Sequence, residues 1–468
     1  MLSMVYHTLR RYRWALAALA SAGLWAAARG QAPETAGTLP EDYFPALKML
    51  LDGAMKQSPQ IILKEIETAQ WEARVYVQDA QRYPSLHGDM NYAENQTAIS
   101  SNSSTRSRDN GLFYDFSLNQ PLFQWGAMKN QSEIARIYVS IAEKRYAEMR
   151  RSLAVSIRQQ YLMLIARKLY LRSQRLTLKS QQADLDLTQD RFQHGTAAEG
   201  EVSGKKLALE DTSLRVARDE TEFVGMRKAF ARLVGLADFS EEELPLEIPK
   251  PVYSAENTSR MLASLLREGG KSTFEAQIAQ LGIKQADLDY RIAKVRLLPK
   301  FNAGIDHAVR NNTTASTNTV SQQGIVQDSI AVSGNWNIFD GFATKGAKLE
   351  ALATKRLRER ELQIASETAI DSAQRLEREL ALDAREIDLT DVRRTLAAAG
   401  IDRVKEEIKL GNQKPTAVED ATVSLYVADF NRSNARAKFL WHWSDFVSLA
   451  ATDPVVNNLP SHYGREKR

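Results

Sequence analysis

The stretch FSLNQPLFQWG, residues Phe116–Gly126, alternates apolar and polar side chains, reaches a proline and then leads into helix-like sequence. A similar change occurs in VSGNWNIFDGF, residues Val332–Phe342, at an offset of 216 residues (116 to 332). Alternation with a period of two predicts a strand, and proline ends regular pairing because it has no N–H group. The chain is therefore predicted to change from strand to long helix twice. Because the glycine stands one position earlier in the second stretch, at Gly341, the two junctions are expected to bend differently.

Three landmarks recur in the same order along the chain. They are RYPSL and LLPKF around Pro84 and Pro299, PLFQWGAMK and NIFDGFATK around Phe123 and Phe339, and the glycines of RFQHG and EIKLG, Gly195 and Gly411. Such recurrence indicates two copies of one unit. The predicted organisation is a signal peptide (1–32), an N-terminal segment (33–57), a first repeat (58–234), a linker (235–272), a second repeat (273–449) and a C-terminal tail (450–468).

The N-terminus carries Arg10, Arg11 and Arg13 before the apolar run WALAALASAGLWAAA, and small residues follow this run. That order predicts a cleaved secretory signal peptide. A single N-terminal membrane anchor is the alternative, although the run is short for a spanning helix. The chain has no cysteine, so its stability must come from packing or oligomerisation and not from disulfides.

Each copy contains two segments in which one face is apolar and the other polar. The apolar faces include Leu112, Tyr114, Phe116 and Leu118 in the first copy, and Ile330, Val332, Trp336 and Ile338 in the second. Strands of about 10 residues with this pattern suit a bilayer crossing, whereas a soluble β-sandwich is the alternative. Four strands are too few to close a barrel, so a barrel would be shared between subunits. The polar segments between the strands, NQTAISSNSSTRSRDNG and NNTTASTNTVSQQG, are expected to be exposed loops.

The long helical segment of the first copy carries two series of apolar residues, each with a spacing of seven. One series is Ile157, Leu164, Leu171, Leu178, Leu185 and Phe192, and the other is Val155, Leu162, Leu169, Leu176 and Ala183. The five-residue offset between the series corresponds to about 140° around a helix. A two-stranded coiled coil needs one seam, so two separated seams predict a neighbouring helix on each flank.

These patterns together resemble the TolC-like outer membrane efflux protein family, from about Ser58 to Leu449. The motifs that carry the resemblance are YPSL and LPKF, PLFQWG and NIFDGF, and RFQHG and IKLG. The resemblance implies an α+β membrane protein: a homotrimer with a transmembrane β-barrel, 4 strands per chain and 12 in the trimer, continuous with a long periplasmic α-helical barrel. It also implies a passive exit duct in outer-membrane lipid, for small-molecule efflux or type I protein secretion. The implied partners are a periplasmic adaptor and an inner-membrane transporter, and neither enzyme activity nor a cofactor is expected.

The resemblance further implies two groups of site residues. Adaptor docking is expected at the two glycine turns, through Arg191, Phe192, Gly195, Thr196, Ile408, Leu410, Gly411 and Asn412. A periplasmic constriction is expected at Glu201, Gln413, Ala417 and Asp420. Acids close to the axis of a pore would favour cations. Ile408 and Gln413 stand where the best-known member of the family has the tyrosine and arginine that lock its gate. Ala417 replaces one acid, so the chain departs from the family pattern here. The simpler alternatives are helix-reversing glycines with positive φ and solvated surface acids.

Other functions receive less support from the composition. The 62 Lys and Arg residues are spread among 58 Asp and Glu residues, so no nucleic-acid partner is expected. The six histidines lie far apart in the sequence and predict no metal site. Two alternative functions remain, a non-channel periplasmic adaptor or helical-hairpin scaffold, and an exported adhesive coiled coil with a single seam.

Overall fold

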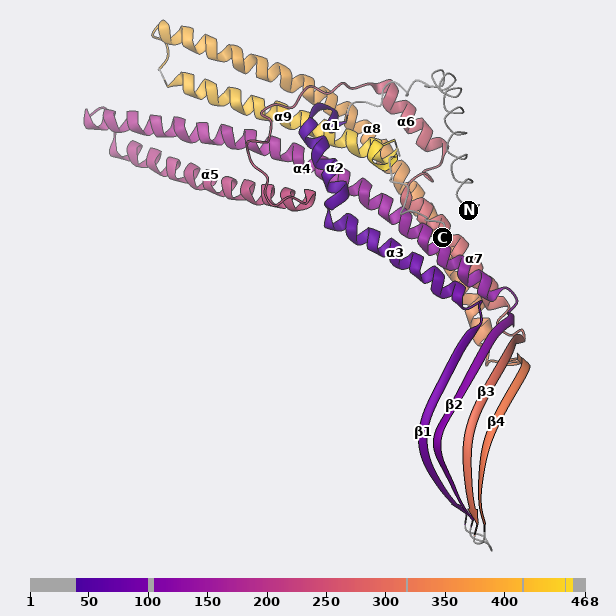
Figure 1. Cartoon of the computed structure of the whole chain (residues 1–468). Coiled ribbons are helices and arrows are strands. Elements are labelled where there is room, and N and C mark those ends of the chain that lie inside the picture. The colour runs from indigo at the N-terminus through magenta and orange to yellow at the C-terminus, as the bar shows by residue number, and fades with distance from the viewer. Residues whose placement is uncertain (1–38, 100–104, 317–318, 415, 451, 458–468) are drawn as a thin grey trace, which may run out of the picture.

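The computed structural model describes residues 39–99, 105–316, 319–414, 416–450 and 452–457. The predicted signal peptide, residues 1–32, lies outside the described residues. A β-sheet occupies one end of the molecule, and a bundle of long helices extends from it (Figure 1). Within the described part of the chain, no helix combines the length and the apolar character needed to cross a bilayer.

The strands form one antiparallel sheet in the order β1-β2-β3-β4. They are β1 (Ser85–Ile99), β2 (Thr105–Phe123), β3 (Lys300–Ser316) and β4 (Thr319–Asn335). Strand β2 pairs with β3 and so joins the first copy of the repeat to the second. Strands β1 and β4 are therefore the two edges of the sheet.

The strands are longer than the sequence predicts, because the polar segments continue the ladder. Pairing runs to Ile99 and Thr105 in the first hairpin and to Ser316 and Thr319 in the second. The prediction that these segments are exposed loops is wrong over most of their length. Threonine has a high β propensity, and backbone groups pair with a neighbouring strand whether or not the side chains are apolar.

Two helices of 67 residues, α4 (Ala127–Gln193) and α8 (Ala343–Lys409), begin and end 216 residues apart. Each is about 100 Å long at 1.5 Å per residue. Helices α5 (Glu199–Val234) and α9 (Ala417–Leu449) return antiparallel to them. The duplicated sequence thus forms a duplicated set of helices.

The remaining helices are shorter. They are α1 (Pro40–Tyr43), α2 (Pro45–Gln57), α3 (Pro59–Ala80), α6 (Ala255–Arg267), α7 (Phe274–Lys294) and α10 (Pro454–Asn457). Helix α4 packs against α3 and α7, and also against α5 and α9 (Figure 1). The predicted neighbours on both flanks are confirmed.

The apolar seams of α4 are buried where these neighbours meet. Ile157, Leu164 and Leu171 are at most 1% exposed, and Leu162 of the other series is equally buried. Phe192, the last residue of the first series, is 44% exposed because the helix ends there. The main apolar core therefore lies near the middle of the molecule.

A fully buried guanidinium joins both ends of the described chain to α4. The Arg158 cluster consists of Arg158, Glu41 of α1, Ser444 of α9 and Asp453 before α10. Nε of Arg158 donates to Glu41 at 2.8 Å, and Nη1 donates to Asp453 at 2.5 Å and to Ser444 at 3.1 Å. Burial acts to lower the pKa of Arg158, but the hydrogen bonds to Asp453 and Glu41 raise it above its ordinary value. The group therefore stays charged.

Replacing Arg158 by methionine leaves Glu41 and Asp453 without a cation. Removing one partner of a buried ion pair costs about 3–5 kcal/mol, so we expect Arg158→Met to lower the unfolding temperature of the purified protein by several degrees. The triple variant Glu41→Gln/Arg158→Met/Asp453→Asn removes every charge and should recover most of this loss. Equal unfolding temperatures for wild type and Arg158→Met would contradict a stabilising role.

Both strand-to-helix junctions contain two consecutive residues in the left-handed region. These are Trp125 (φ 54°) and Gly126 (φ 78°) before α4, and Gly341 (φ 61°) and Phe342 (φ 69°) before α8. The two pairs share this conformation although glycine occupies the second position of one pair and the first of the other. The junctions still differ, as predicted, because β2 continues to Phe123, shortly before α4, whereas β4 already ends at Asn335.

The junctions allow a matched test of backbone strain. Gly126 has open space around its Cα but a positive φ, whereas Gly204 has open space and lies inside α5. We expect Gly126→Ala to destabilise the protein by about 1–2 kcal/mol and Gly204→Ala to stabilise it by about 0.5–1 kcal/mol. Thermal unfolding of the two variants checks this expectation, and the same sign for both changes would contradict it.

Candidate functional site: the helical hairpin tips

Both long helices end in the same hydrogen-bonded turn. At the first tip (residues 191–201), Gly195 has a φ of 71°, its N–H donates to the Phe192 carbonyl at 2.9 Å, and Thr196 N–H donates to the Arg191 carbonyl at 2.8 Å. This pair of bonds is a Schellman motif, which requires a left-handed residue after the helix. The expectation of a positive φ at this glycine is confirmed.

The second tip (residues 407–420) repeats this geometry. Gly411 has a φ of 77°, its N–H donates to Ile408 at 3.0 Å, and Asn412 N–H donates to Glu407 at 2.9 Å. Glu407 also accepts from the side-chain amide of Gln413 at 2.6 Å. The Gln413 side chain therefore adds a hydrogen bond within its own turn.

Arg191 braces the first turn with its side chain. Its guanidinium donates to the Thr196 carbonyl at 3.3 Å and forms an ion pair with Glu201 at 3.3 Å. Glu201 lies in the first turn of α5, where the helix dipole also favours a carboxylate. The expected constriction acid of the first copy is thus paired with a base from the same tip.

The second copy places its acid against the other hairpin. Ala417 begins α9 and carries no charge, whereas Asp420 lies in the first turn and accepts a hydrogen bond from Ser180 Oγ of α4 at 3.1 Å. This contact connects residues 240 positions apart. It brings the two hairpins together close to their tips.

A lysine that the sequence analysis missed lies among these acids. Lys205 of α5 forms an ion pair with Asp184 of α4 at 2.5 Å. The hydrogen bond and charge of Asp184 raise the pKa of Lys205, and the charges of Glu201 and Asp420 add to this effect. Lys205 therefore offsets part of the negative field that was expected from the two constriction acids.

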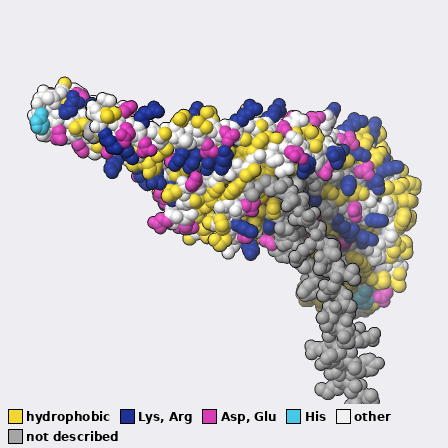
Figure 2. Space-filling view, turned by 90° about the horizontal axis from the view of Figure 1, so that it is seen from above, with side chains coloured by type: hydrophobic (Ala, Val, Ile, Leu, Met, Phe, Trp, Pro, Cys, Tyr) yellow, Lys and Arg dark blue, Asp and Glu magenta, His cyan; other side chains and the backbone are white. Residues whose placement is uncertain are grey.

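Two apolar side chains of the expected docking group remain exposed at the turns. Phe192 is 44% exposed and Leu410 is 73% exposed. Figure 2 shows side chains of both charges interspersed along the arm of long helices. Among the described residues, no group of three or more His, Asp or Glu side chains is arranged to hold a metal ion.

Comparison with known proteins agrees with this geometry. The sequence profile of the family described as outer membrane efflux protein matches residues 50–236. Over this part of its length the chain resembles the TolC-like outer membrane efflux protein family. The members of this family are transport proteins and not enzymes, and their channels lie in the outer membrane and extend into the periplasm. No curated protein matches the chain significantly.

Solved structures of outer membrane channels show the same TolC-like fold at low sequence identity. The CmeC outer membrane channel of Campylobacter jejuni is 14% identical with a TM-score of 0.67, and the match covers 89% of each chain. A membrane protein from Pseudomonas aeruginosa is 16% identical with a TM-score of 0.65, covering 86% of this chain and 90% of that one. The outer membrane protein VceC of Vibrio cholerae is 14% identical with a TM-score of 0.62, covering 88% and 98%.

The charges at the tips predict opposite effects of two substitutions on ion selectivity. Lys205→Gln leaves Asp184, Glu201 and Asp420 less compensated and should raise the cation-to-anion permeability ratio, whereas Asp420→Asn should lower it. At low salt, where screening is weak, we expect changes of about twofold or more. Reversal potentials across planar bilayers measure the ratio. Shifts of equal sign, or none, would show that these residues do not face the ion path.

Proposed function

We propose that three copies of this chain form a passive exit duct that spans the outer membrane and the periplasm. Small molecules or secreted polypeptides would pass through it. A periplasmic adaptor, coupled to an inner-membrane transporter, would dock at the hairpin tips. Channels of the TolC family form trimers in efflux systems, which supports the proposed number of copies.

The observation that carries this proposal is that the chain has two different open edges. Strand β1 and helices α3 and α5 lie along one edge, and β4 and α8 lie along the other (Figure 1). An unpaired strand edge presents free N–H and C=O groups to a partner. Two different edges that pair head to tail generate a closed ring when the rotation closes.

Leucines on both edges point to a helical neighbour. On α8, Leu382, Leu389 and Leu396 are 50–67% exposed and lie seven residues apart. On α5, Leu207 and Leu214 are 74% and 53% exposed, again seven residues apart. Leucines at heptad spacing form the seams of packed helices, so these two rows fit contacts between adjacent copies.

The sheet supports a lipid-facing role. Leu86, Met90 and Tyr92 of β1 are 71–75% exposed, and Ile330 and Val332 of β4 are 85% and 70% exposed. In the described structure the sheet has extensive contacts only among its own strands, so no second layer covers these side chains as in a soluble sandwich. Strands of 15–19 residues exceed the 9–11 or so that a tilted crossing needs.

The alternative functions receive less support from this arrangement. A single-seam adhesive coiled coil does not account for a central helix with neighbours on both flanks. A non-channel adaptor or scaffold does not account for four long strands with an exposed apolar face. Adaptor docking is supported by the exposed Phe192 and Leu410 at the two tips.

The edge leucines provide the test of assembly. We expect Leu382→Glu/Leu389→Glu to abolish the heat-modifiable trimer on electrophoresis and the single-channel conductance in planar bilayers, because charges would be buried between helices. Leu187→Glu, on the central helix α4, is the matched control and should keep both. Trimers and conductance that survive the double substitution would contradict an interface at this edge.

A further inference from the structure

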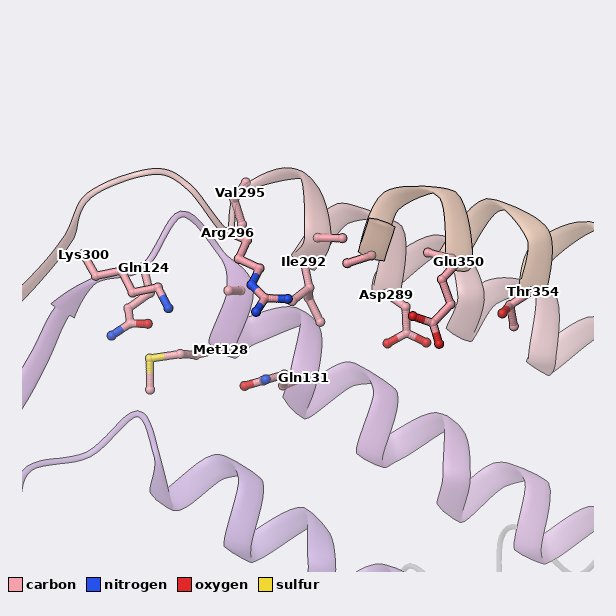
Figure 3. Close-up of a pocket in the computed structure, with 14 residues that line it drawn as sticks. Gln124, Met128, Gln131, Asp289, Ile292, Val295, Arg296, Lys300, Glu350 and Thr354 are labelled. Carbon is pink, nitrogen blue, oxygen red and sulfur yellow. The ribbon is translucent and has the colours of Figure 1, made fainter. Parts of the chain in front are cut away.

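A cavity of about 400 Å³ lies where the helices meet the sheet. Its walls come from the end of β2 and the start of α4, from the end of α7 with the turn after it, and from the first turns of α8 (Figure 3). We call it the junction cavity. Its volume lies within the range of small-molecule sites, which is roughly 300–1,000 Å³.

The charges of the junction cavity are separated by sign. Arg296 and Lys300 lie at the end near the sheet, and Asp289 and Glu350 lie at the other end (Figure 3). Within the described part of the chain, none of these four side chains has an ion-pair partner within 4.0 Å. Burial raises the pKa of Asp289, and a hydrogen bond with Gln285 only partly opposes this. Neither end of the cavity therefore contains a closed ion pair, although Asp340, whose pKa is lowered by hydrogen bonds from Thr344 and by the charge of Arg296, lies near the basic end.

The spacing along α7 sets the distance between the two ends. Asp289, Ile292, Ala293 and Arg296 follow one another at i, i+3, i+4 and i+7, so they share one face. Helix α7 ends at Lys294, and Arg296 lies in the turn that follows. The helical rise of 1.5 Å per residue therefore gives only the backbone separation of the acid and the base, which is about 10 Å. Ile292 and Ala293 lie between them, and Met128 of α4 forms part of the opposite wall. The apolar strip thus connects two charged ends.

At the sheet end of the cavity, Lys300 belongs to a strand face that carries polar side chains. Lys300 begins β3 and shares a strand face with Asn302 and Asp306, whereas Phe301 and Ile305 are on the other face. In the proposed duct the polar face lines the interior. A solute that passes from the helical part to the strands would therefore meet the junction cavity at the transition.

We propose that the junction cavity is a transit site for amphipathic zwitterions whose ammonium and carboxylate groups are separated by an apolar chain. The ammonium group would meet Asp289 and Glu350, the apolar body would lie on Ile292, and the carboxylate would meet Arg296 and Lys300. This inference rests on the proposed function for its place on an exit path, but binding to the cavity can be measured independently of transport.

The site suits passage better than retention. Arg296, Lys300 and Glu350 are exposed, so water and salt screen their interactions with a ligand. Conduction requires a solute to bind strongly enough to enter and weakly enough to leave. Affinity in the millimolar to micromolar range would satisfy both conditions.

The experiment measures binding of 8-aminooctanoate to the full-length protein in detergent by calorimetry. Its amine and carboxylate are joined by a chain that spans the two ends of the cavity. We expect 4-aminobutyrate, which is too short to reach both ends, and octylamine or octanoate, which carry one charge each, to bind at least about tenfold more weakly at low salt. Equal affinities across this series would overturn the proposal.

Substitutions locate the site. We expect Arg296→Gln and Glu350→Gln each to weaken binding of 8-aminooctanoate about tenfold. The matched controls are Lys284→Gln, on another face of α7, and Glu359→Gln, nine residues beyond Glu350 on α8, and neither lines the cavity. Loss of binding in the controls, or none in the two cavity variants, would place the ligand elsewhere.

Conductance separates the two proposals. If the duct conducts, 8-aminooctanoate should reduce the single-channel current reversibly in the wild type and less in Arg296→Gln. If the protein conducts but does not prefer 8-aminooctanoate to the shorter ligand, the cavity proposal is contradicted and the duct proposal is not. Selective binding to a protein that does not conduct would contradict the duct and support the cavity proposal.

Discussion

The fully buried charge of Arg158, near the middle of α4, constrains the rest of the chain. Arg158 is fully buried, and burying an unpaired guanidinium would be very costly, so Glu41 and Asp453 must both be in place. These two residues belong to segments at opposite ends of the described chain. The surrounding apolar core, in which α4, α5, α8 and α9 meet, fixes the directions in which the long helices project. The position of the tips and of the sheet follows from this central packing.

Much of the helical fold could be predicted because the apolar residues that are buried between helices recur at a regular spacing in the sequence. The seven-residue spacing of Ile157, Leu164 and Leu171 reports which face is buried, and the offset of the second series reports a second neighbour. The strand lengths could not be predicted in this way. Around Ile99 and Thr105 the ladder is held by backbone hydrogen bonds, which leave no apolar pattern in the sequence.

At the tips, contacts within one hairpin could be predicted from the sequence, whereas contacts between the two copies could not. The glycine turns were predicted, and the pairing of Asp184 with Lys205 could have been found, because the two residues are almost equidistant from Gly195 in an antiparallel hairpin. Ser180 and Asp420 come from different copies, and no local spacing reports their contact. The junction cavity is also invisible in the sequence, since three separate segments close it, and the helical spacing within each segment does not tell which segments meet.

Glycine occupies the second left-handed position at the junction before α4 and the first at the junction before α8. This difference affects how the two repeats should be aligned. Each junction needs two left-handed residues, but glycine fills only one of them, so the other is a tryptophan or a phenylalanine. An alignment of the copies that superimposes Gly126 on Gly341 would shift α8 by one residue, or about 100° of rotation. The backbone instead equates Gly126 with Phe342. Shared torsion angles, and not shared glycines, are therefore the safer anchor for tracing how the duplicated halves diverged.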